Sequence, residues 1–205
     1  MKTMIAEKIP GYTYGESSVA RSPITPRELE SLKQSAGFTG QDQHYLRLAG
    51  EVLSDQTEKL VERWRAVISV HPHLAKHSQR PDGQPNPRYS RDSGLRFQQW
   101  ILDTCLLPYD QDWLNYQQEI ALRHTSLKKN KTDNVESSGF IPLRHIVAFT
   151  GVINDAGIIK PFLTAKGHTA EEVDRMYRAW CKSVLLQIAL WTEPYTNSKL
   201  APNEW

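Results

Sequence analysis

The sequence predicts an all-α protein, and three observations support this prediction. Apolar residues recur every three or four positions through most of the 205-residue chain, as they do on helices. No segment alternates apolar and polar residues over the length of a strand. A helix-start signal, Thr followed three residues later by Glu, occurs at Thr25 and again at Thr169. We therefore expect about seven or eight helices in one domain, because a chain of this length can bury a single core.

The first 24 residues should form an irregular leader. Gly, Pro, Ser and Tyr are frequent in residues 5–24, and residues 9–15 read IPGYTYG. This composition interrupts regular structure, and the tyrosines can anchor the segment on an apolar surface. We expect a leader of residues 1–24 that packs on a single domain of residues 25–205.

Threonines mark the helix starts in the first half of the domain. Thr25, with a proline directly after it, should begin a short helix that runs to about Ser35. A second helix should begin after Thr39. From Tyr45 the apolar residues keep helical period up to the stop at His71-Pro72, which indicates one long helix or two joined.

Turn residues and apolar stripes alternate in the middle of the chain. The turn-rich residues 79–91 should precede a helix that runs through Leu102. Tyr109-Asp110 should open the next helix, and residues 128–139 should form a polar loop.

Two further helices complete the prediction. Pro142 should start one that Pro161 kinks or divides. Thr169 should cap the last one, which carries an apolar stripe. The stripe consists of Val173, Met176, Tyr177, Trp180, Val184, Ile188 and Trp191.

The composition argues against several classes of protein. Lys and Arg number 25 and Asp and Glu 23, so the net charge of +2 gives little attraction for nucleic acid. The densest basic cluster, residues 128–131, is short and lacks aromatic residues, and we expect a solvated loop without a function of its own. Cys105 and Cys181 form no CxxC pattern, which argues against a zinc site or disulfide scaffold and suits a reducing compartment.

No membrane segment or secretion signal is expected. Residues 1–8 contain no apolar run, and no window approaches the roughly 20 apolar residues of a membrane span. We therefore expect a cytoplasmic protein. The motifs GxGxxG, GxxxxGK[ST], GxSxG and HExxH are absent, so most nucleotide-binding and hydrolase functions lose support.

His124 is the leading candidate for a functional residue. It follows Trp113, Tyr116, Gln117 and Ile120 at helical spacing, which directs its imidazole toward the core. A buried imidazole needs a partner, either a hydrogen bond inside the core or a metal or haem iron. The spacing alone favours the hydrogen bond. Helices of this length could also enclose a haem pocket, so both interpretations stay open at this point.

The other histidines are weaker candidates. His71 and His73 could chelate a metal, but the intervening proline and the turn setting indicate an exposed pair. We expect His145 to be a helix histidine whose hydrogen bonds are made.

Several blocks of sequence resemble the protoglobins, which are single-domain members of the globin-coupled-sensor lineage. The blocks fall in order with similar separations and cover nearly the whole chain, as residues 9–15, 49–53, 71–74, 96–104, 113–124, 132–137 and 160–191. The resemblance implies a globin-like helical sandwich with an extra N-terminal helix and leader. It also implies deeply buried haem b, which we expect to be noncovalent because the chain has no CxxCH attachment motif.

The resemblance also assigns residues to the haem site. His124 matches the proximal iron ligand, whose other ring nitrogen should meet a carbonyl or another acceptor. Trp64, Phe97 and Phe149 match pocket aromatics, and Arg96 matches a position that contacts a haem propionate. The set expected to bind the cofactor is Trp64, Arg65, Arg96, Phe97, Ile120, His124, Phe149 and Ile153, with His124 as the metal ligand.

The chain departs from the family in two places. After Trp64 the family places a tyrosine that can hydrogen-bond the haem ligand, whereas this chain has Arg65. An arginine keeps its proton, and burying it unpaired is costly, so Arg65 must find an anion or turn to solvent. A haem propionate or an anionic haem ligand would serve. Residues 75–78, which read AKHS, replace an aromatic-rich segment and make this corner more polar.

Three functions follow from these observations, in decreasing order of support. The first is a haem b protein that binds O2, CO, NO or anionic haem ligands, with transport, storage, scavenging and sensing all open. The second is a haem-dependent redox enzyme of peroxidase or NO-dioxygenase type, in which Arg65 and His77 face the iron. The third is a haem-free interaction module with His124 as a core residue. Residues 176–191 could also serve a homodimer through an apolar outer face.

Overall fold

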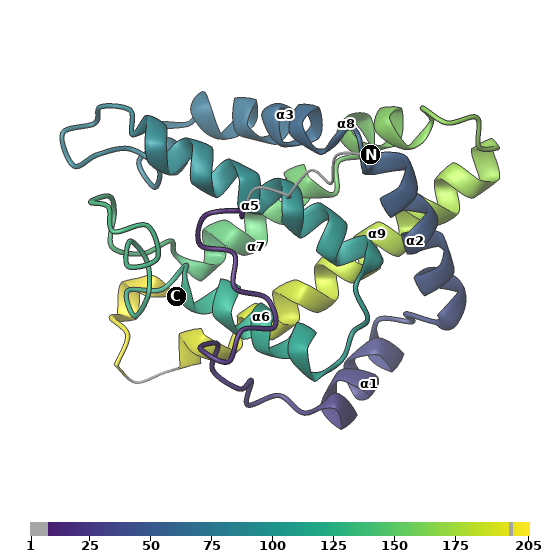
Figure 1. Cartoon of the computed structure of the whole chain (residues 1–205), viewed down its shortest axis with the longest axis horizontal. Helices are drawn as coiled ribbons and strands as arrows, with labels where there is room; N and C mark the ends of the chain where they lie inside the picture. The colour runs from purple at the N-terminus through teal and green to yellow at the C-terminus, as the bar shows by residue number, and fades with distance from the viewer. Residues whose placement is uncertain (1–7, 197–198) are drawn as a thin grey trace, which may run out of the picture.

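The computed structural model describes residues 8–196 and 199–205, and these residues form nine α-helices and no strand (Figure 1). The all-α prediction is confirmed. The number of helices is higher than expected because α4 is a short helix of four residues, which the sequence did not indicate. The helices are α1 Pro26–Ser35, α2 Gly40–Leu53, α3 Thr57–Ser69, α4 Pro72–Ala75, α5 Pro87–Leu106, α6 Gln111–Leu122, α7 Leu143–Ile153, α8 Ala156–Leu163 and α9 Ala170–Trp191, followed by the 3₁₀ turns η1 Glu193–Thr196 and η2 Pro202–Glu204.

Threonine caps fix three helix starts. The side chains of Thr25, Thr39 and Thr169 accept hydrogen bonds from the backbone three residues on, and the carboxylate at that position accepts from the backbone of the cap. α1 and α9 therefore begin where expected. The segment expected as one long helix or two joined is two helices, because α2 ends at Leu53 and α3 begins at Thr57.

α5 begins earlier than predicted. It starts at Pro87, inside the turn-rich residues 79–91, because the Asn86 side chain accepts from the Tyr89 amide at 3.2 Å and caps the helix. A proline at the first helical position loses no hydrogen bond there, so Pro87 marks a start rather than a turn.

The prediction that Pro161 divides the helix after Pro142 is wrong. The division falls at Asp155, whose carboxylate accepts from the Gly157 amide at 2.6 Å and caps α8. Pro161 lies inside α8, and α7 and α8 are bent by 49° with respect to each other. A local cap therefore decided the break, several residues before the proline.

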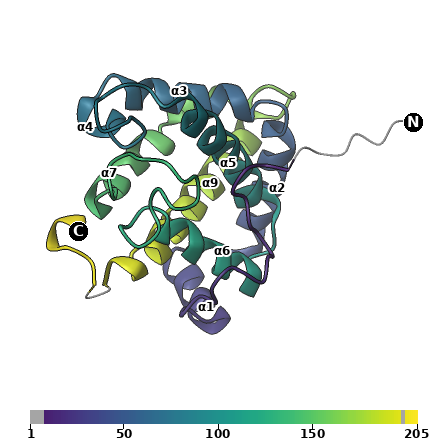
Figure 2. The same ribbon diagram turned by 60° about the vertical axis from the view of Figure 1, so that its left-hand side comes forward.

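α9 runs through the centre of the molecule, and in the view of Figure 2 α3 and α4 lie above it and α1 and α6 below it. It packs against α2, α6, α7 and α8. Trp64 of α3, Trp113 of α6 and Trp180 of α9 are fully buried. The rings of Trp64 and Trp180 stack with centroids 6.0 Å apart. Because aromatic side chains bury large areas, these contacts fix the helices around a single core.

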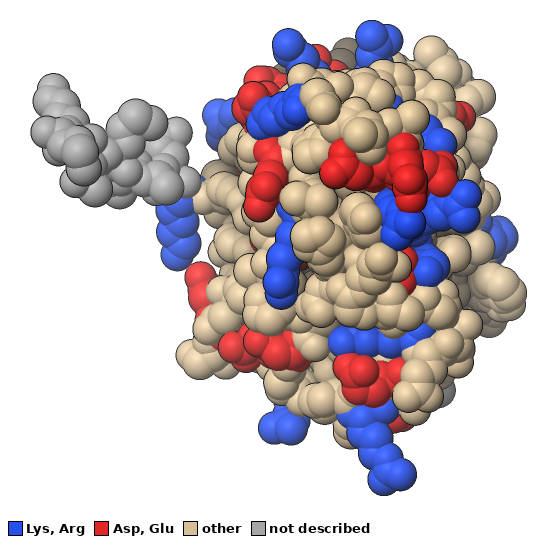
Figure 3. Space-filling view, turned by 90° about the vertical axis from the view of Figure 1, so that its right-hand side faces the viewer, with Lys and Arg blue, Asp and Glu red and all other residues tan. Residues whose placement is uncertain are grey.

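The surface carries charges of both signs. On the face drawn in Figure 3, Lys and Arg side chains are interspersed with Asp and Glu. Ion pairs along α9 have the same character, as between Arg175 and Glu171 and between Arg178 and Asp174. This face therefore presents no extended field of one sign that would attract a polyanion.

Two features of the described residues concern disulfide bonds and membrane spans. Cys105 of α5 and Cys181 of α9 are free thiols. No single helix combines the length and the apolar composition needed to cross a membrane, whereas α7 and α8 satisfy both conditions together as a bent pair.

Residues 8–24 run over α5 and α6 without forming a helix or a strand (Figure 1). Tyr12 Oη donates to both carboxylate oxygens of Asp103 on α5, at 3.1 and 3.0 Å. The Tyr12 ring also packs edge-on against Tyr116 of α6, with centroids 5.2 Å apart. An aromatic anchor therefore holds this part of the leader on the domain.

Two arginines hold the leader backbone. Arg96 donates to the Pro10 carbonyl oxygen and Arg123 to that of Gly11, each at 2.7 Å. Gly11 has a φ of +70°, and a Cβ there would lie 2.7 Å from Thr132 Cγ2. The leader can approach this closely because residue 11 is glycine. Residues 1–7 of the expected leader lie outside the described residues, and the division between residues 24 and 25 stays a prediction.

Asp103→Asn should remove a pH dependence of stability. Burial raises the pKa of Asp103 to about 6, and hydrogen bonds from Gln99 and Tyr12 oppose this rise only in part. A pKa raised on folding stabilises the fold below the ordinary value of 3.8, and this contribution is lost as the pH rises through about 6. Between these values, urea unfolding should show the stability of the wild type falling with pH relative to Asp103→Asn. Parallel pH profiles of the two proteins would contradict the expectation.

Candidate functional site

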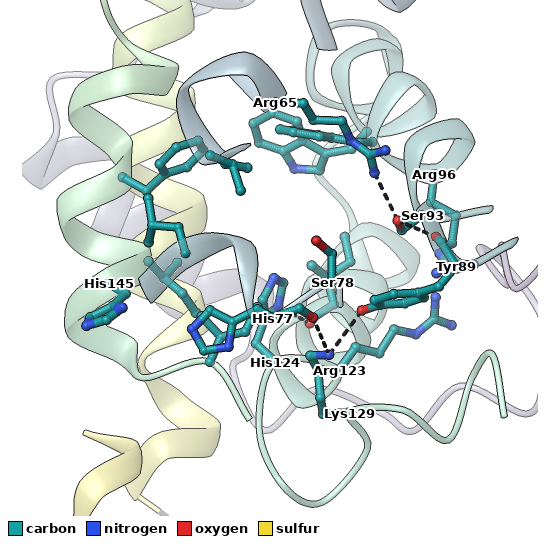
Figure 4. A pocket seen from close by; sticks show the side chains of 18 of the residues that line it. Arg65, His77, Ser78, Tyr89, Ser93, Arg96, Arg123, His124, Lys129 and His145 are labelled. Carbon is teal, nitrogen blue, oxygen red and sulfur yellow. Dashed lines mark hydrogen bonds between the residues drawn. The ribbon is translucent and has the colours of Figure 1, made fainter. Parts of the chain in front are cut away.

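A cavity of about 590 Å³ lies between α3, α5, α6, α7 and α9 and the loops after α4 and α6 (Figure 4). Its lining is mostly apolar. Trp64 is the one residue of the expected haem site that does not line it. The fully buried Trp64 ring stacks on Phe97 at 5.2 Å, behind the cavity wall. The expected residues that do line it are Arg65, Arg96, Phe97, Ile120, His124, Phe149 and Ile153.

His124 presents a neutral imidazole to the cavity. It lies two residues past the end of α6 at Leu122, so the helix expected to carry it stops short of it. Nδ1 contacts the Ile120 carbonyl oxygen at 2.8 Å, and it must carry the proton because a carbonyl can only accept. Nε2 therefore keeps its lone pair. Burial lowers the pKa of His124 to about 4, which keeps the ring neutral near pH 7.

Trp191 and Gln117 hold the His124 ring in place. The Trp191 ring stacks on the imidazole with centroids 5.4 Å apart. Trp191 Nε1 donates to Gln117 Oε1 at 2.8 Å, and both side chains are buried. α6 and α9 therefore fix the plane of the ring, and the Ile120 carbonyl fixes its tautomer. In metal sites, the residues around a metal-binding histidine fix the same two properties, its ring orientation and its tautomer.

Arg65 lies across the cavity from His124 (Figure 4). Its Nη1 donates to the Ser90 carbonyl oxygen at 2.6 Å, and its Nη2 donates to Ser93 Oγ at 2.9 Å. Burial lowers the pKa of Arg65, yet an arginine stays protonated in a protein. The cavity therefore places a cation opposite a neutral imidazole.

Arg96 is already paired. Its guanidinium donates to both carboxylate oxygens of Asp133, at 2.9 and 2.7 Å, and to the Pro10 carbonyl oxygen. A haem propionate at Arg96 would have to share the guanidinium with Asp133. Arg123 and Lys128, which also line the cavity, both donate to Glu119.

Lys129 is a cavity residue that sequence reasoning missed. The expectation that residues 128–131 form a solvated loop is wrong for Lys129, which is 5% exposed. Burial lowers its pKa to about 8. Two of its partners, His77 and Tyr89, lie 52 and 40 residues away in the sequence, and no local pattern marks them. Nζ donates to the His77 carbonyl oxygen, Tyr89 Oη, Asn130 Oδ1 and Ser137 Oγ.

His77 is buried and lies on the same side of the cavity as His124 (Figure 4). Its Nδ1 lies 2.6 Å from Ser138 Oγ, and its buried Nε2 has no hydrogen-bond partner among the described residues. Burial lowers its pKa to about 4. The redox-enzyme interpretation places His77 and Arg65 together at the iron, whereas Figure 4 shows them on different sides of the cavity.

The remaining histidines do not form a metal site. His71 and His73 are exposed, with ring centroids 5.6 Å apart. The expectation that the hydrogen bonds of His145 are made is wrong, because its buried Nδ1 has no partner among the described residues. Among all the residues that the structure describes, no group of three or more His, Cys, Asp or Glu could hold a metal ion. A haem iron, by contrast, needs only one protein ligand, because the porphyrin supplies the others.

Comparison with known proteins adds a family to this geometry. A protein-family model described as Protoglobin matches residues 25–201, which is most of the chain. No curated protein matches the sequence. The matched range begins at Thr25, the cap of α1, and includes all the residues expected at the haem site.

Proposed function

The chain belongs to the protoglobin family, and from this membership we propose that it binds haem b noncovalently through His124 and takes O2, CO or NO at the iron. Protoglobins are globin-type haem proteins that bind gases. The main support for His124 as the iron ligand is the state of its ring. Its Nδ1 is committed to the Ile120 carbonyl, which leaves the Nε2 lone pair for a ligand beside a mostly apolar cavity.

The residues present fit a haem group. Phe97, Phe149 and Ile153 give the cavity apolar walls, as a flat apolar macrocycle requires. Arg96 and Arg123 place guanidinium groups in the lining, where propionates would share them with Asp133 and Glu119. When bound, haem would supply an iron with one position open to a small ligand.

The side chains of the chain itself would control access to that position. Trp64 backs Phe97, and the stacked pair limits the room on its side of the cavity. Arg65 makes the side across from His124 polar. His124 would hold the iron, and its ring stays neutral because protonation of a buried ring is costly.

Absorption spectra test this proposal. A haem b protein with one histidine ligand should show an intense Soret band that shifts on reduction and again when CO is added. A colourless protein that takes up no added haem would favour the haem-free interaction module instead.

Acid–organic extraction should release the haem from the protein. The two cysteines, Cys105 and Cys181, stand in no CxxCH motif, so no thioether bond is expected to hold the porphyrin. Absorbance of the protein and solvent fractions would measure the release, with a c-type cytochrome as the control that retains its haem. Haem that remained with this polypeptide would disprove noncovalent binding.

A redox enzyme of peroxidase or NO-dioxygenase type is the second candidate function. Arg65 favours it, because a cation across from the proximal histidine can stabilise negative charge that develops on a ligand. Turnover of peroxide with a reporter substrate, lost in Arg65→Leu, would support the enzyme. We further propose a homodimer through α9, because the apolar side chain of Leu185 on this helix is 54% exposed. Analytical sedimentation would measure the oligomeric state.

A further inference from the structure

We propose that Arg65 forms an anion-binding subsite inside the cavity and strengthens the binding of small anionic ligands much more than that of neutral ones. The inference rests on the proposed function, because such a ligand would bind between Arg65 and an iron held by His124. It goes further by naming the chemical class of the ligand. Four observations on the described residues carry it.

The first observation is that the guanidinium of Arg65 has unused donors. A guanidinium carries five N–H groups, and the Ser90 carbonyl and Ser93 Oγ each accept one. Three N–H groups therefore have no acceptor among the described residues. Since Arg65 lines the cavity, an acceptor that entered it could take them.

The second observation is the charge of the cavity wall. Arg96 is paired with Asp133, and Arg123 and Lys128 share Glu119. Lys129 has four oxygen acceptors for its three protons, so none of its donors is unused. Arg65 is therefore the lining cation that combines unused donors with the lack of a carboxylate among the described residues.

The third observation is that the position of the guanidinium is fixed. Ser93 Oγ donates to the Tyr89 carbonyl oxygen at 2.6 Å, so it can only accept from Arg65. The Ser90 carbonyl belongs to the same turn of α5. A group held at two points loses little further freedom when a ligand binds, which strengthens the interaction.

The fourth observation is that Gly94 makes room for Arg65. A Cβ at residue 94 would lie 3.2 Å from Nη1 and 3.4 Å from Cζ of Arg65. The absence of a side chain lets the guanidinium approach the backbone of α5. Helical glycine costs stability relative to alanine, by roughly 0.5–1 kcal/mol, so this close approach is retained at a cost to the helix.

Fluoride is the probe for this subsite, because it is a small anion that binds ferric haem and accepts hydrogen bonds. Arg65→Leu should weaken fluoride binding to the ferric haem protein by roughly 10- to 100-fold, as expected from one charge-assisted hydrogen bond. CO binding to the ferrous protein should change much less, because CO is neutral. Titration followed by absorption measures both. The matched control is Arg63→Leu, which removes an exposed arginine from the same helix and should leave fluoride affinity unchanged.

Gly94→Ala provides a second variant that should fold well. Alanine is the better helix former, so α5 should keep its stability, but the added Cβ must displace the guanidinium by a few tenths of an ångström. We expect fluoride affinity to fall in this variant while circular dichroism and CO affinity stay as in the wild type. This result would show that the position of Arg65, and not its charge alone, sets the affinity.

The outcomes separate the inference from the proposed function. Equal fluoride affinity of wild type and Arg65→Leu, both with normal haem content, would overturn the inference alone. Loss of haem from Arg65→Leu with unchanged fluoride affinity of the remaining holoprotein would also overturn it, since Arg65 would then hold a propionate. A wild-type chain that binds no haem would overturn the proposed function and the inference together.

Discussion

His124→Ala should yield a protein that does not retain haem. A carbonyl fixes the tautomer of this imidazole and Trp191 fixes its ring, and its removal would take away the proposed bond between protein and iron. The ratio of Soret to protein absorbance after gel filtration should fall to near zero. Apolar contacts in the cavity would then hold the porphyrin only weakly.

Three histidine variants are the controls for this result. His71→Ala and His73→Ala change exposed residues and should retain haem. His77→Ala is the sharper control, because His77 is buried on the same side of the cavity and its Nε2 also has no partner among the described residues. A native haem spectrum in His124→Ala, together with its loss in His77→Ala, would move the ligand role to His77.

Asp133→Ala should lower the free energy of unfolding by about 3–5 kcal/mol, as expected when one partner of a buried ion pair is removed. Both side chains of the Arg96–Asp133 pair are largely buried, with exposed fractions of 14% and 8%. Without the carboxylate, Arg96 keeps its charge in a place where, among the described residues, only the Pro10 carbonyl still accepts from it. Urea unfolding of the apoprotein measures the change, because no propionate can then replace Asp133.

Glu171→Ala is the matched control for the ion pair. Glu171 pairs with Arg175 at the surface, where both side chains are more than 40% exposed, as 73% and 41%. Such pairs contribute about 0–1 kcal/mol, so this variant should unfold nearly as the wild type does. A similarly small effect of Asp133→Ala would mean that Arg96 turns to solvent or to another acceptor.

Local signals predicted the parts of the fold that local physics decides. The capping threonines Thr25 and Thr169 gave correct helix starts, because a cap satisfies backbone amides within three residues. Where two local signals competed, the cap decided the position of the break. Pro161 was expected to break its helix, but the Asp155 cap placed the break earlier and left Pro161 within α8.

The candidate site was predictable only as far as single residues could be matched to a family. Periodicity directed His124 inward, and the resemblance supplied its proposed role. The partners that decide the electrostatics lie far away in the sequence. Asp133, the partner of Arg96, is 37 residues further along, and the acceptors of Lys129 come from residues 77, 89 and 137. No spacing rule connects such positions before the chain has folded.

The hydrogen bonds from Arg96 and Arg123 to the leader backbone also bear on how fast a large molecule could enter or leave the cavity. These two arginines line the cavity on one side and bind the Pro10 and Gly11 carbonyls on the other. A porphyrin that entered or left between these arginines would have to break their hydrogen bonds with the leader backbone. Such local openings cost less than global unfolding, and their frequency limits every exchange that depends on them. The rate of such an exchange would then depend on how often a segment without regular structure detaches, in addition to the strength of any bond between His124 and an iron.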